Sequence, residues 1–182
     1  QLHEPALAAV LAAFAAAIVL GGYIRAADAR TGFTTEVAGL VGLEDVVAEI
    51  TASGGEAVAN RTSVSDWNAA KEMIEQAVDT YGDLHILVNN AGILRDKMSF
   101  NMEEDEWDAV VNVHLKGHFC PSRHAGTYWR SQSKAGHDAA RRIINTSSEA
   151  GLFGNAGQAN YAAAKSGIAT LAIVFGRELA AY

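Results

Sequence analysis

The chain has 182 residues, of which 49% are hydrophobic, so it can form one domain with a substantial core. Its net charge of −7 gives little electrostatic support to nucleic-acid binding, and no nucleic-acid partner is expected. The single cysteine, Cys120, excludes an internal disulfide and suits the reducing cytoplasm, where we expect the protein to reside. His114 and His118 share a helix face without a third ligand, so no metal is expected.

The amino end is the least regular part of the sequence. Residues 5–20 are uncharged, rich in alanine and apolar on every side. This run favours a buried helix that leads into a strand near Ala17–Leu20. A membrane span is the less favoured alternative, because alanine is weakly apolar and a span needs about 20 apolar residues. A third alternative is an incomplete or misread copy of a gene.

Further along, strands and helices are expected to alternate. Leu43–Ser53 has the apolar spacing of a helix, and Glu56–Val64 is expected to be a short strand. Ser65 is expected to cap a second helix, which ends at Gly82, since serine is a common N-cap residue and glycine a common helix terminator.

The second half of the chain continues this alternation. The expected strands are Leu84–Val88 and Arg142–Ser147. A helix begins in the acidic turn Glu103–Glu106 and continues past Leu115, with a kink near Gly117 or Pro121. The last helix covers Gln158–Ala180. Because no linker or repeat interrupts the pattern, residues 1–182 are expected to form a single, partial α/β domain.

Three side chains near the carboxyl end have the chemistry of proton transfer. Tyr161 and Lys165 are four residues apart, so they share a face of the last helix. An adjacent cation favours the ionised form of a phenol, which makes Tyr161 a candidate general acid/base. Ser148 follows the apolar strand and can hold the oxygen of a substrate. Ser147 is the runner-up, on the opposite face if the strand continues.

A second motif lies upstream of these residues. Asn89-Asn90-Ala91-Gly92 comes directly after the expected strand Leu84–Val88. Open α/β sheets bind ligands at the carboxyl ends of their parallel strands. This turn is therefore expected to line a ligand site.

With these motifs, the sequence resembles the short-chain dehydrogenase/reductase family, from about Thr31 to the end. It is most similar to 3-oxoacyl-thioester reductases and to the 3-hydroxyacyl-CoA dehydrogenase domain of peroxisomal multifunctional enzymes. The resemblance implies a Rossmann-type doubly wound parallel sheet, NAD or NADP as cofactor with NAD slightly favoured, an acyl thioester substrate and a homo-oligomer. The matching stretches are Gly54–Ala59, Asn89–Asp96, Trp107–Phe119 and Ile143–Lys165.

The resemblance also implies roles for individual residues. Tyr161 is the acid/base, Lys165 promotes its ionisation and binds the nicotinamide ribose, and Ser148 orients the substrate oxygen. His114 occupies a proton-relay position that usually holds asparagine; its backbone carbonyl would hold a water, and its imidazole either takes part or merely packs. The residues expected to line the cofactor are Asn90, Ala91 and Gly92, with Ser63 and Val64 near the adenine.

The sequence departs from the family at both ends. It contains no Gly-x-x-x-Gly-x-Gly pattern, and it stops at Tyr182, inside or just after the last helix. We therefore expect the first strand with its Gly-rich turn, and the carboxyl-terminal strands, to be lacking. The alternative function is a non-catalytic fragment or structural remnant that cannot bind a dinucleotide.

Overall fold

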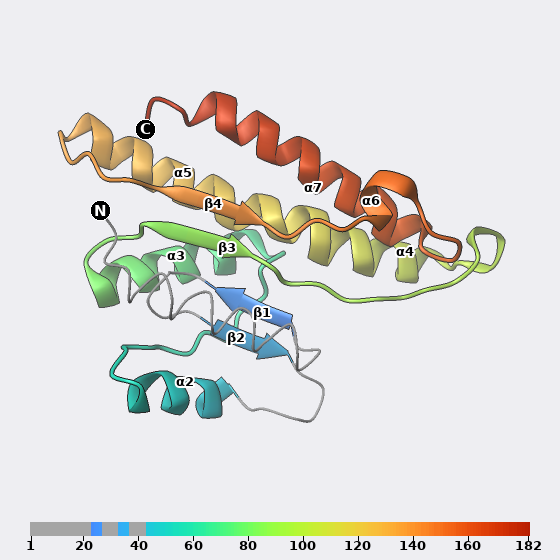
Figure 1. The fold of residues 1–182 in the computed structure, drawn as a ribbon, viewed down its shortest axis with the longest axis horizontal. Coiled ribbons are helices and arrows are strands. Elements are labelled where there is room, and N and C mark those ends of the chain that lie inside the picture. The colour runs from blue at the N-terminus through green and yellow to red at the C-terminus, as the bar shows by residue number, and fades with distance from the viewer. Residues whose placement is uncertain (1–22, 27–32, 37–42) are drawn as a thin grey trace.

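The computed structural model describes residues 23–26, 33–36 and 43–182, which form a mixed α/β structure (Figure 1). The expectations for residues 1–22, namely the helix leading into a strand near Ala17–Leu20 and the membrane span, lie outside the described residues. Among the helices that are described, none is long and apolar enough to cross a membrane.

A four-stranded sheet has the order β2-β1-β3-β4. Its strands are β1 (Tyr23–Ala26), β2 (Phe33–Glu36), β3 (Ile86–Asn89) and β4 (Arg142–Asn145). The expected parallel pairing is present between β3 and β4, whereas β1 runs antiparallel to both β2 and β3. The sheet is thus only partly the parallel one that the sequence predicted, and the β1–β2 hairpin was not predicted.

The predicted strand Glu56–Val64 is wrong, because these residues belong to no strand. A strand exists only where a neighbour supplies backbone hydrogen bonds, and the two edges of β3 are taken by β1 and β4. Val64 is nevertheless buried, and it packs in a cluster with Met73 and Ala91. Val64 is the only residue of this segment that is buried.

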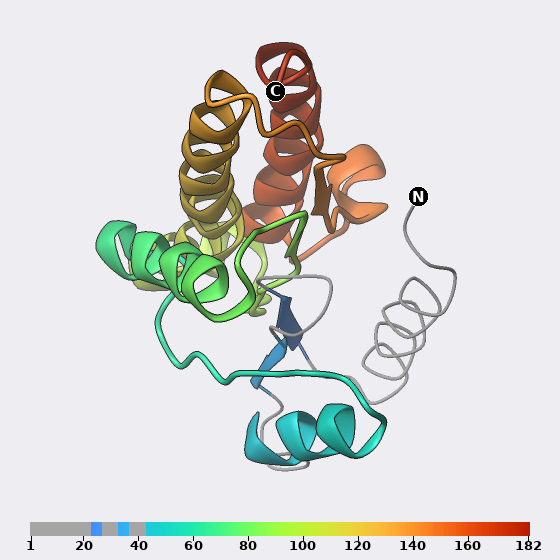
Figure 2. The ribbon, with the colours of Figure 1, turned by 90° about the vertical axis from the view of Figure 1, so that its left-hand side faces the viewer.

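The longer helices follow the predicted segments closely, whereas the short helix α6 and a 3₁₀ turn were not predicted. They are α2 (Leu43–Ala52), α3 (Trp67–Tyr81), α4 (Glu104–Val111), α5 (Gly117–Lys134), α6 (Ala150–Phe153) and α7 (Ala159–Glu178), with a short 3₁₀ turn at Ser99–Asn101. Figure 2 shows α3, α5 and α7 gathered on one side of the β3–β4 pair, while α2 lies near the β1–β2 hairpin. The helices α5 and α7 thereby reach the sheet end where the predicted site residues lie.

The ends of α3 show how local chemistry sets a helix boundary. Gly82 ends the helix in a left-handed conformation with φ of 81°, as predicted. The N-cap is Asp66 rather than the predicted Ser65, since the Asp66 carboxylate accepts the Ala69 N–H at 2.8 Å. The Ser65 hydroxyl is instead occupied by Asn112, whose Nδ2 donates to it at 3.2 Å. Serine and aspartate are equally good caps, so tertiary contacts decided between them.

The long helical segment after residue 103 breaks where the sequence placed its kink. Glu103 and Glu106 form a capping box at the start of α4, where their negative charge suits the helix dipole. A π-helical turn, Asn112–Lys116, then separates α4 from α5 and ends at Gly117. Pro121 lies inside α5, so the break is at the glycine end of the predicted range. Such wide turns often mark functional positions.

The main core lies between the sheet and the helices α3 and α5. The buried cluster contains Ile74, Ala77, Leu84, Leu87, Ala125 and Trp129. Alternation along β4 turns Ile143 into this core and leaves Ile144 46% exposed, as expected for a strand with one covered face. The covered face is the one beneath α5.

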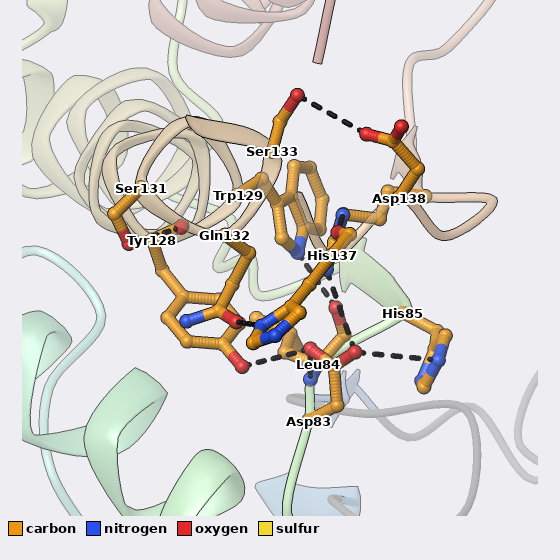
Figure 3. Close-up of polar contacts among 11 residues, drawn as sticks. Asp83, Leu84, His85, Tyr128, Trp129, Ser131, Gln132, Ser133, His137 and Asp138 are labelled. Carbon is orange, nitrogen blue, oxygen red and sulfur yellow. Dashed lines mark hydrogen bonds and ion pairs between the residues drawn. The ribbon is translucent and has the colours of Figure 1, made fainter. Parts of the chain in front are cut away.

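A polar cluster ties the far end of α5 to the start of β3 (Figure 3). The Asp83 carboxylate accepts hydrogen bonds from the Tyr128 hydroxyl at 2.8 Å and from the Leu84 N–H at 2.7 Å. Trp129 donates its indole N–H to the Leu84 carbonyl at 2.6 Å, and Arg141 lies 3.4 Å from Asp83. These contacts hold α5 in register with β3 and β4 and so fix where the opposite end of α5 lies.

Candidate active site

The candidate site lies at the carboxyl ends of the parallel strands β3 and β4. Asn89 and Asn145 are paired across the two strands, and the Thr146 N–H donates to the Asn89 carbonyl at 3.0 Å. The Asn89 side chain also donates to the Asn145 amide oxygen at 2.9 Å. The turn after β3 and the turn after β4 are therefore held side by side, although they are far apart in sequence.

Lys165 is buried at this sheet end, with 3% of its surface exposed. Its Nζ donates to the Thr146 carbonyl at 2.6 Å and lies 5.5 Å from the centre of the Tyr161 ring. Burial lowers the pKa of Lys165 to about 8. The predicted neighbourhood of the phenol and the ammonium on one helix face is thus present. Tyr161 is half-buried, and its ring lies between Lys165 and the π-helical turn.

The two candidate serines have different partners. Ser147 donates its hydroxyl to the Lys165 carbonyl at 2.9 Å, which ties β4 to α7. The Ser148 hydroxyl is half-buried and accepts the Ala150 N–H at 3.2 Å, so its own proton can still be donated to a substrate oxygen. This difference favours Ser148 over Ser147 for the substrate.

Gly151 explains how the segment after Ser148 stays close to α7. A Cβ at this position would lie 2.7 Å from the backbone of Lys165 and Ser166, so only glycine lets α6 approach α7 this closely. The short helix after Ser148 is thereby pressed against the helix that carries Tyr161.

His114 lies in the π-helical turn and is 1% exposed. Its Nε2 is 2.8 Å from the Ile93 carbonyl and 3.1 Å from the Ile93 nitrogen. The shorter contact favours a neutral ring whose Nε2–H donates to the carbonyl. Its ring meets the Tyr161 ring edge to face at 5.0 Å. Burial, with Lys165 as a further charge, lowers the pKa of His114 to about 4 despite the Ile93 carbonyl.

The imidazole of His114 contacts both Ile93 and the Tyr161 ring. It joins the turn after β3 to the tyrosine, and Gly92 makes this contact possible. A Cβ on Gly92 would lie 2.3 Å from His114 Cε1, well inside the closest contact that a real side chain makes. Gly92 and His114 were singled out separately by the sequence, and the structure brings them together.

The other predicted cofactor residues fall into two groups. Val64, Asn90 and Ala91 all line one small cavity of about 10 Å³ beside Gly117, enough for about one water molecule. Ser63 is exposed, and its hydroxyl lies 3.0 Å from that of Ser65. The structure thus joins Val64 to the Asn90-Ala91-Gly92 turn and leaves Ser63 at the surface beside it.

The donor groups fit one end of a nicotinamide dinucleotide. A phenol, a buried ammonium and a polar turn at the carboxyl ends of parallel strands suit a nicotinamide riboside. A diphosphate needs backbone N–H groups at a helix start that glycines leave open, and no such turn occurs within the part of the chain that the structure describes. That part also has no group of three or more residues able to hold a metal.

Residues 24–182 match the short-chain dehydrogenase family, and the chain belongs to this family. It is 48% identical over 163 residues to hydroxyacyl-CoA dehydrogenase ChsB1 of Mycobacterium tuberculosis, covering 85% of this chain and 51% of that protein. It is 44% identical over 138 residues to 3-oxoacyl-acyl-carrier-protein reductase FabG of Staphylococcus aureus, covering 75% and 53%.

Solved structures agree with this assignment. A short-chain dehydrogenase from Mycobacterium avium superposes with a TM-score of 0.75 at 58% identity, covering 76% of this chain and 49% of that one. The chain spans about half the length of the two curated relatives named above. The chain therefore corresponds to about half of such a relative.

Asn160 and His118 are among the buried polar side chains to which the sequence assigned no functional role. Asn160 is 0% exposed and His118 is 1% exposed. Asn160 adjoins Tyr161, and an amide inside the first turn of a helix could have been flagged as a possible bridge. No local signal distinguishes His118 from a surface histidine.

Proposed function

We propose that the protein is an NAD(P)-dependent oxidoreductase that transfers a hydride between nicotinamide and a secondary alcohol or ketone. The observation that carries this proposal is the buried Lys165 ammonium beside the Tyr161 ring, at the carboxyl ends of two parallel strands. Burying an ammonium is costly without a function or a close partner, and Lys165 has only the Thr146 carbonyl as a hydrogen-bond acceptor among the described residues.

Each residue has one task in this proposal. The Tyr161 hydroxyl donates a proton to the ketone oxygen during reduction, or removes one from the alcohol during oxidation. The Ser148 hydroxyl donates to the same oxygen and holds it in place. Lys165 places its positive charge beside the Tyr161 ring and binds the ribose. The nicotinamide, when bound, supplies or accepts the hydride.

The substrate class is proposed to be a 3-hydroxyacyl or 3-oxoacyl thioester. Relatives named as a hydroxyacyl-CoA dehydrogenase and as a 3-oxoacyl-carrier-protein reductase favour it. NAD remains slightly preferred over NADP, as inferred from the family resemblance. We also propose that residues 1–182 form a single domain and that the protein is cytoplasmic. Some of the relatives, in contrast, are named as peroxisomal proteins.

The test is direct. The purified chain is titrated with NADH and with NADPH by calorimetry, and 3-oxobutanoyl-CoA is then added while absorbance of the reduced nicotinamide is followed. Binding with turnover supports the proposal. Absence of both favours the alternative, a non-catalytic fragment or structural remnant that does not bind a dinucleotide, for which the missing Gly-x-x-x-Gly-x-Gly pattern argues.

We also propose that the protein forms a homo-oligomer. An open, mostly apolar groove of about 960 Å³ runs between the α4–α5 segment and α7, and Leu115, Phe119 and Leu171 line it. A second copy could cover this surface. Light scattering tests the proposal by measuring the molar mass of the wild-type chain and of Leu171→Glu. A wild-type chain that is monomeric at micromolar concentration would contradict the proposal, as would an oligomer whose mass Leu171→Glu leaves unchanged.

A further inference from the structure

Asn160 is fully buried at the start of α7, immediately before Tyr161. Its Nδ2 donates to the Arg95 carbonyl at 3.2 Å and to the Glu106 carbonyl at 3.1 Å. Its Oδ1 accepts the Tyr161 N–H at 2.7 Å. One amide thus joins the loop after β3, the helix α4 and the backbone of Tyr161.

These bonds are unlike those of an ordinary helix cap. The N-cap of α7 is Gln158, whose side chain makes no capping bond, and Asn160 lies inside the first turn. A capping side chain serves its own helix, whereas both protons of the Asn160 amide are donated to other segments of the chain. If Asn160 were only a local cap of α7, its hydrogen bonds to the Arg95 and Glu106 carbonyls would have no explanation.

We propose that Asn160 is a positioning residue for Tyr161, an inference that rests on the function proposed above. The loop bearing Arg95 continues directly from the Asn90-Ala91-Gly92 turn, and Glu106 lies one helix before the turn that carries His114. By binding both, Asn160 sets where the tyrosine stands relative to the turn that would line the cofactor. A displacement of about 1 Å at a reacting group can cost about a hundredfold in rate.

Other contacts join the same segments, among them a backbone hydrogen bond from the Lys97 N–H to the Gly157 carbonyl at 2.9 Å. Gln158 donates to Asp96 at 2.8 Å, and Lys97 forms an ion pair with Glu106 at 2.8 Å. The Gln158–Asp96 bond is exposed and Lys97 is 46% exposed, so water and salt compete with these two side-chain contacts. The Asn160 bonds differ in that they are shielded from water and act on the first turn of α7 itself, directly beside Tyr161.

Two substitutions separate the two halves of the amide. Asn160→Ala removes all three bonds. Asn160→Asp keeps an oxygen that can accept the Tyr161 N–H. It replaces the Nδ2 donor by a second oxygen, which then faces the Arg95 and Glu106 carbonyls. Burial and these carbonyls raise the pKa of the introduced carboxyl, and its protonated form can donate to one of them. Asn160→Asp should therefore recover function as the pH falls, which Asn160→Ala cannot do.

The experiment compares both variants with the wild-type chain and with Asn155→Ala. Asn155 is an exposed asparagine in the connection to α7, and its Nδ2 bonds only Gln158 at 3.1 Å among the contacts described. One readout is amide hydrogen exchange at Tyr161 and across residues 93–97, which needs no cofactor. The second is kcat and KM against pH, with NADH and 3-oxobutanoyl-CoA.

We expect Asn160→Ala to speed exchange at Tyr161 and in the loop by about tenfold and to lower kcat by about ten- to a hundredfold, with KM nearly unchanged. Asn160→Asp should show partial recovery of slow exchange and of kcat at low pH. Asn155→Ala should match the wild type in both. If Asn160→Ala does not fold, the pH dependence of Asn160→Asp decides.

Two results overturn the inference: exchange at Tyr161 and residues 93–97 that is unchanged in Asn160→Ala, or a kcat within about twofold of the wild type where turnover is present. A wild-type chain without turnover contradicts the proposed function alone. In that case the exchange measurement still decides whether Asn160 holds Tyr161 to the loop.

Discussion

At the scale of single residues, helical spacing brings Tyr161 and Lys165 together, and burial sets the pKa of Lys165. The four-residue spacing places both on one face of α7, and the sheet end then encloses the ammonium beside the Thr146 carbonyl. Nothing in the sequence states that this lysine is buried. Its lowered pKa follows from that enclosure.

Tyr161→Phe should abolish hydride transfer and leave dinucleotide binding intact, because only the phenolic proton is lost. The expected decrease in kcat is about 10²- to 10⁴-fold, the range for a missing general acid/base. Steady-state kinetics and calorimetry measure the two effects separately. Turnover within about tenfold of the wild type would show that another group carries the proton.

Gly92 and His114 make a second residue-scale prediction, which concerns stability. Gly92→Ala places a methyl group where His114 stands and should cost about 1–3 kcal/mol in the free energy of unfolding. His114→Ala removes the ring and its bonds to Ile93, and should impair turnover less than Tyr161→Phe does.

The double variant tests whether these two positions contact each other. With the imidazole gone, the methyl group has room, so the cost of Gly92→Ala should nearly vanish in the His114→Ala background. Urea unfolding of all four proteins gives the coupling energy. Additive costs would mean that the close approach at 2.3 Å is relieved in some other way.

At the scale of elements, the Asp83 cluster shows how α5 is held against the sheet (Figure 3). Burial raises the pKa of the Asp83 carboxyl, but the hydrogen bonds from Tyr128 and Leu84 and the neighbouring positive charges outweigh it, and the pKa is lowered. The Tyr128 hydroxyl is affected reciprocally: burial and Asp83 raise its pKa to about 12. Both directions indicate that the phenol donates to an ionised carboxylate.

Tyr128→Phe should therefore destabilise the fold by about 1–2 kcal/mol at neutral pH, the typical value of a hydrogen bond to a charged group. A lowered carboxyl pKa means that this stability is present above the ordinary value of about 4 and is lost as the pH falls through the folded-state pKa. The difference between variant and wild type should thus shrink in acid.

Urea unfolding at pH 7 and pH 3 measures this effect, with Tyr182→Phe as the matched control. The Tyr182 hydroxyl accepts a hydrogen bond at 3.4 Å from Arg130, an exposed side chain, so removing this hydroxyl should change little. A Tyr128→Phe cost that stays constant with pH would show that the hydroxyl does not act through Asp83.

At the scale of the whole molecule, two buried histidines make the fold sensitive to acid. Burial, together with nearby positive charge, lowers the pKa of His114 to about 4 and that of His118 to about 3. The folded chain keeps both rings neutral, while the unfolded chain protonates them below about pH 6.5. Stability is therefore complete above that value and falls as the pH decreases toward the folded-state values.

His118→Leu tests this account. Neither ring nitrogen of His118 has a hydrogen-bond partner among the described residues, so an apolar side chain should be tolerated at neutral pH. Between pH 7 and pH 5 the variant should lose about 2 kcal/mol less stability than the wild type. Equal losses, measured by urea unfolding at the two pH values, would mean that His118 is not buried as the fold shows it.

The sequence by itself determined the features that depend on near neighbours along the chain. Apolar spacing and terminating glycines predicted α2, α3 and α7 almost to their ends, because helix periodicity and caps are local. The four-residue spacing of Tyr161 and Lys165 likewise predicted their common face. The motifs were specific enough to indicate the family, and the comparisons confirmed it.

Only the tertiary structure decided the features that need a distant partner. Glu56–Val64 is not a strand, since β1 and β4 occupy both edges of β3. The contact of His114 with Gly92 and the bonds of Asn160 to Arg95 and Glu106 join segments far apart in sequence. A hydrogen bond or a steric contact depends on distance in space, and that distance is set only when the core brings β3, β4 and the helices together.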